Sequence, residues 1–214
     1  DSSFTGTVDG IGSGLRIFAG GLVGSNSGAI SGSSAGGSVS ASADTVGLVG
    51  GFAGINIGAI SDSSASAGAT LSVTTVTEEV GSQIGGFAAV NAGTISGAEA
   101  TGDVSAFVGD FDPEEFEATG SLISITPGDT ELNAGGFVGY NLRSEGLPGT
   151  ITASRSENSV YVQGGYGDTF VGDVTVGGFA GRNEGSIDKA RADSAVSVLL
   201  TEDLASDEAD LALS

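Results

Sequence analysis

The chain has 214 residues and a formal net charge of −21, from 27 acidic and only 6 basic residues. It contains 39 glycines but no cysteine, histidine, methionine or tryptophan. These counts exclude a Ser-His-Asp triad, a cysteine nucleophile and a zinc site with His or Cys ligands, and the acidic balance excludes nucleic acid and anionic membranes as partners.

Residues 1–19 precede the first copy of a repeated pattern. Within them, Phe4–Val8 and Leu15–Phe18 have the alternation of short strands. Residues 1–19 are therefore predicted to be an N-terminal cap or a partial repeat.

Residues 20–198 contain the pattern G-G-[FL]-[VA]-[GA]-x-N-x-G-x-I five times in one register. The copies are Gly20–Ile30, Gly50–Ile60, Gly85–Ile95, Gly135–Ile151 and Gly177–Ile187. The asparagine of each copy is Asn26, Asn56, Asn91, Asn141 or Asn183. The residue four positions earlier is Leu22 in the first copy and Phe52, Phe87, Phe137 or Phe179 in the others. A sequence that repeats itself in this way is typical of stacked units.

Small and apolar residues alternate after each isoleucine, up to Val39, Ala69, Val104, Val160 or Val196. A period of two indicates strands with one buried face. The predicted fold is therefore an all-β parallel solenoid of about five repeats, in which equivalent side chains lie about 4.7–4.9 Å apart. Stacked asparagine amides can hydrogen-bond to one another along such an axis. An ordinary β-sandwich with glycine-rich turns is the alternative.

The glycine two residues after the asparagine (Gly28, Gly58, Gly93 or Gly185) indicates a corner. Such a corner needs either a positive φ or a close approach of two backbones.

Two insertions interrupt the repeats and predict protruding hairpins. The shorter one, Leu142–Pro148, delays the isoleucine of the fourth copy. The longer one, 105–134, is rich in acids. Within it, Asp110, Asp112 and Glu114 have the alternating spacing of hard oxygen ligands for calcium. The alternative is a solvated acidic loop without a metal. No other cofactor is indicated.

The last segment, 199–214, is an acidic tail or cap. It combines several carboxylates with Leu200, Leu204 and Leu211. No apolar run of 18 residues occurs, so no membrane span is expected.

The full motif, with its trailing S-x-A-x-G-x-V, resembles the GLUG-motif repeat of bacterial secreted and surface proteins. The five copies cover about half of the chain, and Leu22, Ala89 and the Leu142–Pro148 insertion depart from the pattern. The resemblance implies a parallel β-solenoid and an extracellular or cell-surface location, and it brings no catalytic residues.

The sequence therefore predicts a non-catalytic extracellular structural protein, either an adhesin module or a self-assembling fibre subunit. The expected partners are other copies joined end to end, or another surface protein or glycan. The alternative is a carbohydrate-binding or carbohydrate-active β-helix, which a groove lined by aromatic rings and carboxylates, such as Tyr161 and Tyr166, would favour.

Overall fold

The computed structural model describes residues 1–12, 16–43, 46–73, 81–108, 130–144, 147–164 and 172–200. Within these ranges the chain forms strands and no helix. Nearly all strand pairs are parallel, so the prediction of an all-β chain with parallel sheets is confirmed.

Ten strands form the largest sheet, sheet A. Its long strand β5 (Ser34–Ala43) pairs on one side with β1 (Ser3–Gly12) over ten residues. On its other side the start of β5 pairs with β9 (Ser64–Ala65) and its end with β10 (Gly68–Val73). The row from β9 continues with β14 (Glu99–Ala100), β21 (Arg155–Ser156) and β26 (Arg191–Ala192). The row from β10 continues with β15 (Val104–Val108), β22 (Ser159–Gly164) and β27 (Ala195–Leu200).

Three further parallel sheets have five strands each. Sheet B contains β2 (Arg16–Gly20), β6 (Val46–Gly50), β11 (Ser82–Gly85), β16 (Thr130–Gly135) and β23 (Gly172–Gly177). Sheet C contains β3 (Val23–Asn26), β7 (Ala53–Asn56), β12 (Ala88–Asn91), β17 (Val138–Asn141) and β24 (Ala180–Asn183). Sheet D contains β4 (Ala29–Ser31), β8 (Ala59–Ser61), β13 (Thr94–Ser96), β20 (Thr150–Thr152) and β25 (Ser186–Asp188).

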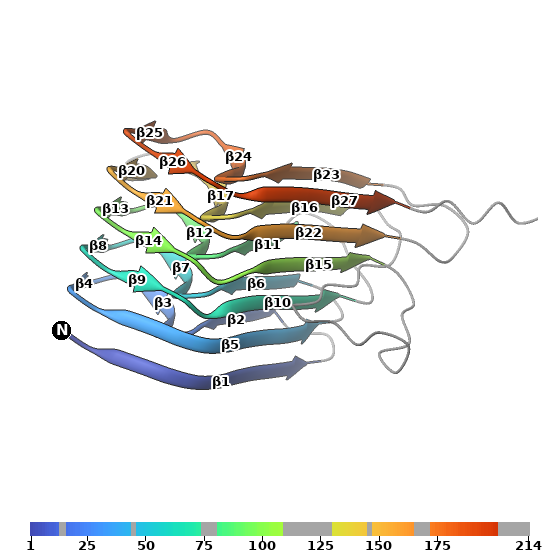
Figure 1. Cartoon of the computed structure of the whole chain (residues 1–214), viewed down its shortest axis with the longest axis horizontal. Coiled ribbons are helices and arrows are strands. Elements are labelled where there is room, and N and C mark those ends of the chain that lie inside the picture. Colours follow the sequence, from blue (N-terminus) through green and yellow to red (C-terminus); the bar gives the residue numbers. More distant parts are fainter. Residues whose placement is uncertain are drawn as a thin grey trace, which may run out of the picture.

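Each repeat contributes strands to sheets B, C, D and A in that order, and each strand pairs with the equivalent strand of the next repeat. Figure 1 shows the resulting layers, from β1 and β5 at one end to β27 at the other. β1 belongs to sheet A alone, so at that end sheet A extends one strand beyond the other sheets. β18 (Arg143–Ser144) and β19 (Leu147–Pro148) form an antiparallel hairpin inside the predicted insertion Leu142–Pro148.

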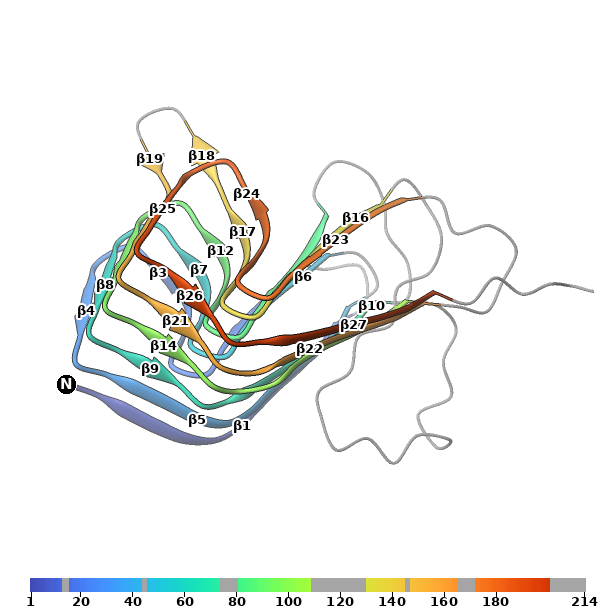
Figure 2. The same ribbon diagram turned by 45° about the horizontal axis from the view of Figure 1, so that its top comes forward.

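Two apolar cores follow from the alternation of side chains. One is enclosed by sheets C, D and the β9 row of sheet A, and it contains Phe52 and Ile60. The other lies between sheet B and the β10 row, where Val49 and Leu71 are buried (Figure 2). The second core consists of Val, Leu, Ile and Ala, so the two sheets pack closely there.

Regular strands extend into two of the predicted segments. Residues 105–108 belong to β15 and 130–134 to β16, so the regular strands extend into the predicted insertion 105–134 at both ends. Residues 109–129 lie outside the described part of the chain. Within the predicted segment 1–19, Arg16 is the first residue of β2, which pairs with β6 as the first strand of sheet B.

Candidate functional site

The five asparagines lie in single file along sheet C. Four hydrogen bonds join their side chains, and each runs from Nδ2 of one residue to Oδ1 of the next. The lengths are 2.8 Å from Asn26 to Asn56, 2.8 Å from Asn56 to Asn91, 2.9 Å from Asn91 to Asn141 and 2.8 Å from Asn141 to Asn183. The first four asparagines are buried, whereas Asn183 at the end of the file is exposed.

In the first four repeats the asparagine Nδ2 also hydrogen-bonds at the corner between sheets C and D. Asn26, Asn56 and Asn91 donate through Nδ2 to the carbonyl of the glycine two residues later, at 3.3 Å. Asn141 reaches Gly149 O at 3.2 Å across the hairpin. One side chain therefore bonds both within its own repeat and between repeats.

Four phenylalanines form a second file. Successive ring centroids are 4.7, 5.0 and 4.7 Å apart from Phe52 to Phe179, and the ring planes deviate from parallel by 7° or less. Phe52, Phe87 and Phe137 are fully buried, and Phe179 is partly exposed. Leu22 continues the file at the other end, where Leu22 N donates to Phe52 O.

Close backbone approach explains three of the glycines after the asparagines, Gly58, Gly93 and Gly185, but not Gly28 of the first repeat. None of them has a positive φ. A Cβ on Gly58 would collide with Gly28 O, and one on Gly93 would collide with Gly58 O. A side chain at this corner would force neighbouring repeats apart.

A left-handed corner between sheets D and A was not predicted. Each repeat has one residue there with φ between +49° and +60°: Gly32, Asp62, Gly97, Ala153 and Lys189. Only two of the five are glycines, so no pattern marks the position. The available signal was its fixed distance of two residues after the isoleucine.

A second polar file also escaped the sequence analysis. Asn133 Nδ2 donates to Gln83 Oε1 at 2.7 Å, and the Thr175 hydroxyl donates to Asn133 Oδ1. Gln83 and Asn133 are buried on the side of sheet B that faces Ile55 and Val90 of sheet C. The position holds Leu48 in the second repeat, so these residue types gave no periodic signal.

The two ends of the stack carry most of the exposed large apolar side chains. They include Ile11 and Phe18 at one end, with 83% and 43% exposure, and Val196, Val198 and Leu199 at the other, each at 46%. The equivalents in the preceding repeat, Val160 and Val162, are 1% and 0% exposed. Within the described residues, β1 and β27 lack a strand partner on their outer edges.

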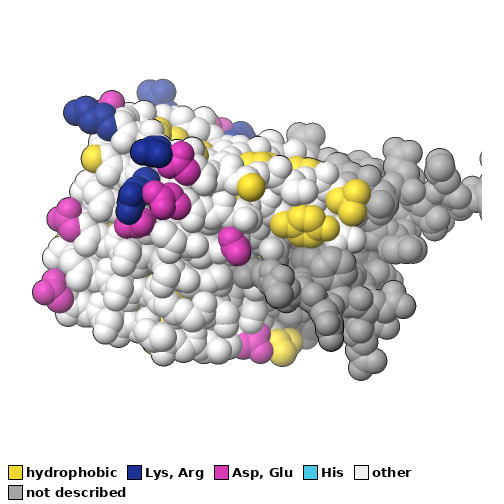
Figure 3. All heavy atoms as spheres, in the orientation of Figure 1, with side chains coloured by type: hydrophobic (Ala, Val, Ile, Leu, Met, Phe, Trp, Pro, Cys, Tyr) yellow, Lys and Arg dark blue, Asp and Glu magenta, His cyan; other side chains and the backbone are white. Residues whose placement is uncertain are grey.

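Basic side chains gather near the β24–β27 end (Figure 3). Arg143, Arg155, Arg182, Lys189 and Arg191 lie in the last two repeats, and of the described basic residues only Arg16 lies elsewhere. Some of these side chains form ion pairs with neighbouring carboxylates: Arg155 contacts Glu99 at 2.6 Å, and Lys189 contacts Asp188 at 3.8 Å.

Two titrating groups at this end respond to their neighbours. A hydrogen bond from Tyr140, followed by one from Arg182, holds the pKa of Glu184 below its ordinary value. The Asp193 carboxylate, which accepts a hydrogen bond from Arg191, raises the pKa of that guanidinium. Arg182 also lies 4.9 Å from the centre of the Tyr140 ring.

An open groove of about 470 Å³ follows the bend of sheet A. It is lined by Gly37, Ser38, Ser66, Gly68, Thr70, Thr101, Gly102 and Asp103. These lining residues include one carboxylate and no aromatic ring. Tyr161 lies on β22, in register with Ser105 of β15, and Tyr166 lies outside the described residues.

The predicted calcium ligands Asp110, Asp112 and Glu114 lie outside the described residues. In the part of the chain that the structure does describe, no three acidic side chains come together as a metal site. No helix in that part is long and apolar enough to cross a membrane.

Comparison with protein-family models, with curated proteins and with solved structures finds no match for this chain.

Proposed function

We propose that this protein is a non-catalytic structural subunit of an extracellular or cell-surface assembly, and that it is a β-solenoid which polymerises end to end. The GLUG-motif resemblance is part of this proposal. One observation carries the proposal. Equivalent strands pair in four parallel sheets, and among the described residues the outermost strands of these sheets have a partner on one side only.

The arrangement of the side chains supports a structural role. The most regular residues are the asparagine and phenylalanine files, which are buried except at the last repeat; the asparagine amides hydrogen-bond to one another and the phenylalanine rings stack. These side chains leave little exposed surface that could bind a substrate. Their regular spacing therefore fits a role in stacking one repeat on the next. An unpaired strand edge is a template for a further strand, and a contact between two different ends that does not close produces a filament.

The composition supports a location outside the cell. The stretch from Ile17 to Leu142 contains no Lys or Arg, so trypsin-like proteases have no cleavage site in it. The net charge of −21 requires screening by salt or cations before copies can approach closely.

Sedimentation velocity and negative-stain electron microscopy of the purified chain test the proposal. We expect rods of constant width that lengthen with protein concentration and with salt, because salt weakens the repulsion between acidic copies. Parallel samples with calcium or a chelator test the predicted ligands Asp110, Asp112 and Glu114. A chain that stays monomeric at every salt and protein concentration would contradict the proposal.

A further inference from the structure

We propose that copies join through one specific strand pair, in which β1 of one copy adds in parallel to the edge of β26 and β27 of another, where no described strand is paired. This inference rests on the proposed function, since it names the contact by which the filament grows. Three observations carry it: the register, the exposed apolar side chains and the charges at the two ends.

The register of sheet A is continuous from β1 to β27. Val8 pairs with Val39, and the column continues through Ala69, Val104 and Val160 to Val196. One more step would place Val8 of the next copy beside Val196. The segments that would then face each other, Ser3–Gly12 and Arg191–Leu200, have equal length.

The exposed apolar side chains of β1 and β27 lie in columns that the proposed register would continue. Val196 and Val198 are 46% exposed, with no described strand beyond β27, although their equivalents in β22 are buried. Ile11 of β1 and Leu199 of β27 stand in one column at opposite ends of the sheet. The proposed pair would bring Ile11 of one copy beside Leu199 of the next and cover both.

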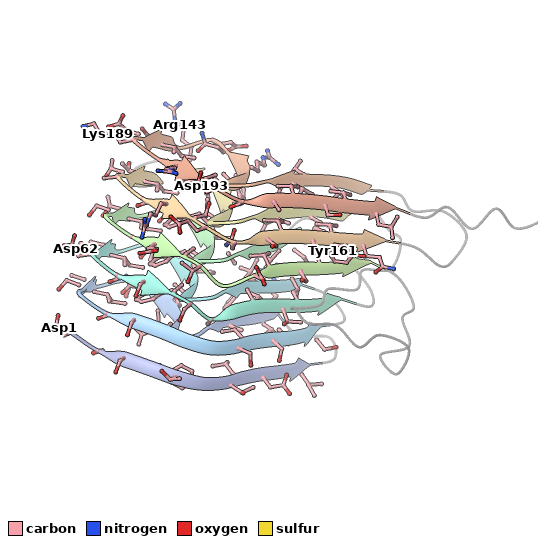
Figure 4. All side chains as sticks on the ribbon, in the orientation of Figure 1. Asp1, Asp62, Arg143, Tyr161, Lys189 and Asp193 are labelled. Atoms are coloured by element: carbon pink, nitrogen blue, oxygen red, sulfur yellow. The ribbon has the colours of Figure 1, made fainter. Side chains whose placement is uncertain are left out.

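The charges are complementary in this register. Asp1 lies one layer before Gly32, and its carboxylate packs against that glycine. Gly32 is the first of the left-handed corners, and the column of these corners ends at Lys189. Figure 4 shows Asp1, Asp62 and Lys189 along the same edge of the molecule. The Lys189 side chain is 79% exposed. One further step of the register would place Asp1 of the next copy beside Lys189.

β1 also decides between two ways of stacking. It covers the edge of β5 over ten residues, so a second copy cannot reach β5 unless β1 is displaced. With β1 in place, each subunit adds six strand layers to sheet A, or about 29 Å along the axis. If β1 were displaced and repeats stacked directly, each subunit would add five layers, or about 24 Å. In sheets B, C and D the proposed contact leaves one strand layer open between copies.

Disulfide cross-linking tests the contact, because the chain has no cysteine of its own. Thr7 and Ala195 are exposed and share one outward column. In-register neighbours on paired strands lie within the Cα separation that a disulfide tolerates. The variant T7C/A195C is expected to form a ladder of covalent oligomers under mild oxidation that reduction returns to monomers. The matched control T7C/S186C places the second cysteine at an exposed position on β25 in sheet D.

Charge reversal supplies a second measurement on the same contact. K189E is expected to raise the concentration needed for assembly about two- to fivefold, as for one exposed ion pair, and the double variant D1K/K189E is expected to restore it. Both variants keep a non-glycine residue at the left-handed corner, so folding is not the variable.

Each result decides between the two proposals. A T7C/A195C ladder that exceeds the control, with an axial repeat near 29 Å by cryo-electron microscopy, supports the β1–β27 contact. Filaments with a repeat near 24 Å, or equal cross-linking of both variants, overturn the contact and leave the proposed function standing. Monomers under all conditions overturn the proposed function and the contact together.

Discussion

Replacing the central asparagine, Asn91, by alanine should destabilise the fold far more than the same change at Asn183. Asn91 has no exposed surface and takes part in three hydrogen bonds. It donates to Asn141 Oδ1 at 2.9 Å and to Gly93 O at 3.3 Å, and it accepts from Asn56 Nδ2 at 2.8 Å. At about 1 kcal/mol each, the loss is about 3 kcal/mol.

The same change at Asn183 removes the hydrogen bond that its Oδ1 accepts from Asn141 Nδ2 at 2.8 Å. Asn183 is exposed, so water replaces the lost acceptor. We expect a loss below about 1.5 kcal/mol for N183A. A third variant, N91L, restores volume without hydrogen bonds and should be destabilised as much as N91A, because its neighbours' amides remain unpaired in a buried site.

Urea unfolding followed by far-UV circular dichroism measures these differences. The comparison is made between variants at low salt, where copies stay apart, because repeat proteins need not unfold in a single step. Equal losses for N91A and N183A, or a stable N91L, would show that the amide file does not hold the repeats together.

Three other changes test separate features of the stack. F87A should lower the free energy of unfolding by about 3–5 kcal/mol, because it removes a fully buried ring between two stacked neighbours. F179A, at the partly exposed end of the file, should lower it by less than half as much in urea unfolding. Equal losses would contradict a packed file of rings. A153G should stabilise the protein by up to about 1 kcal/mol in the same assay, because glycine relieves the strain of φ +49°; destabilisation would mean that the corner is not strained. Y140F should raise the pKa of Glu184 towards its ordinary value in a carbon-13 NMR titration, since the Tyr140 hydrogen bond is the main cause of the depression. A carboxyl whose pKa is lowered in the folded state adds stability at pH values above its unfolded pKa, and this stability is lost as the pH falls through the folded pKa. The wild type should therefore lose the contribution of Glu184 at a lower pH than Y140F does. Identical titrations of the two proteins would exclude the Tyr140 hydrogen bond.

The sequence was most informative where one residue type repeats at one offset. The spacing of Asn56 and Asn91 reflects a hydrogen bond that needs an amide on both sides, so the chemistry itself enforces repetition. The alternation up to Val39 and Val104 likewise indicated the buried face of sheet A. The parallel pairing followed from the fact that neighbours are successive copies.

Features that many residue types can satisfy were missed. The left-handed corner accepts Asp62, Ala153 and Lys189 at a modest energetic cost, so no consensus marks it. The buried pair of Gln83 and Asn133 occurs in only two repeats and left no period to detect. Strand β15 continues past Val104, the last residue of the repeated pattern, and no pattern in the sequence indicated this extension.

The order of the sheets has a consequence for how this chain can vary. Every connection from sheet A back to sheet B starts after a strand of the β10 row or its equivalent in β1 and β5, and ends before a strand of sheet B. These connections range from the two residues 44–45 to the twenty-one residues 109–129. Closing the longer segment costs only about 2 kcal/mol more than closing the shorter one. We therefore expect the connections from sheet A to sheet B to accept inserted peptides of very different length without a change in strand pairing.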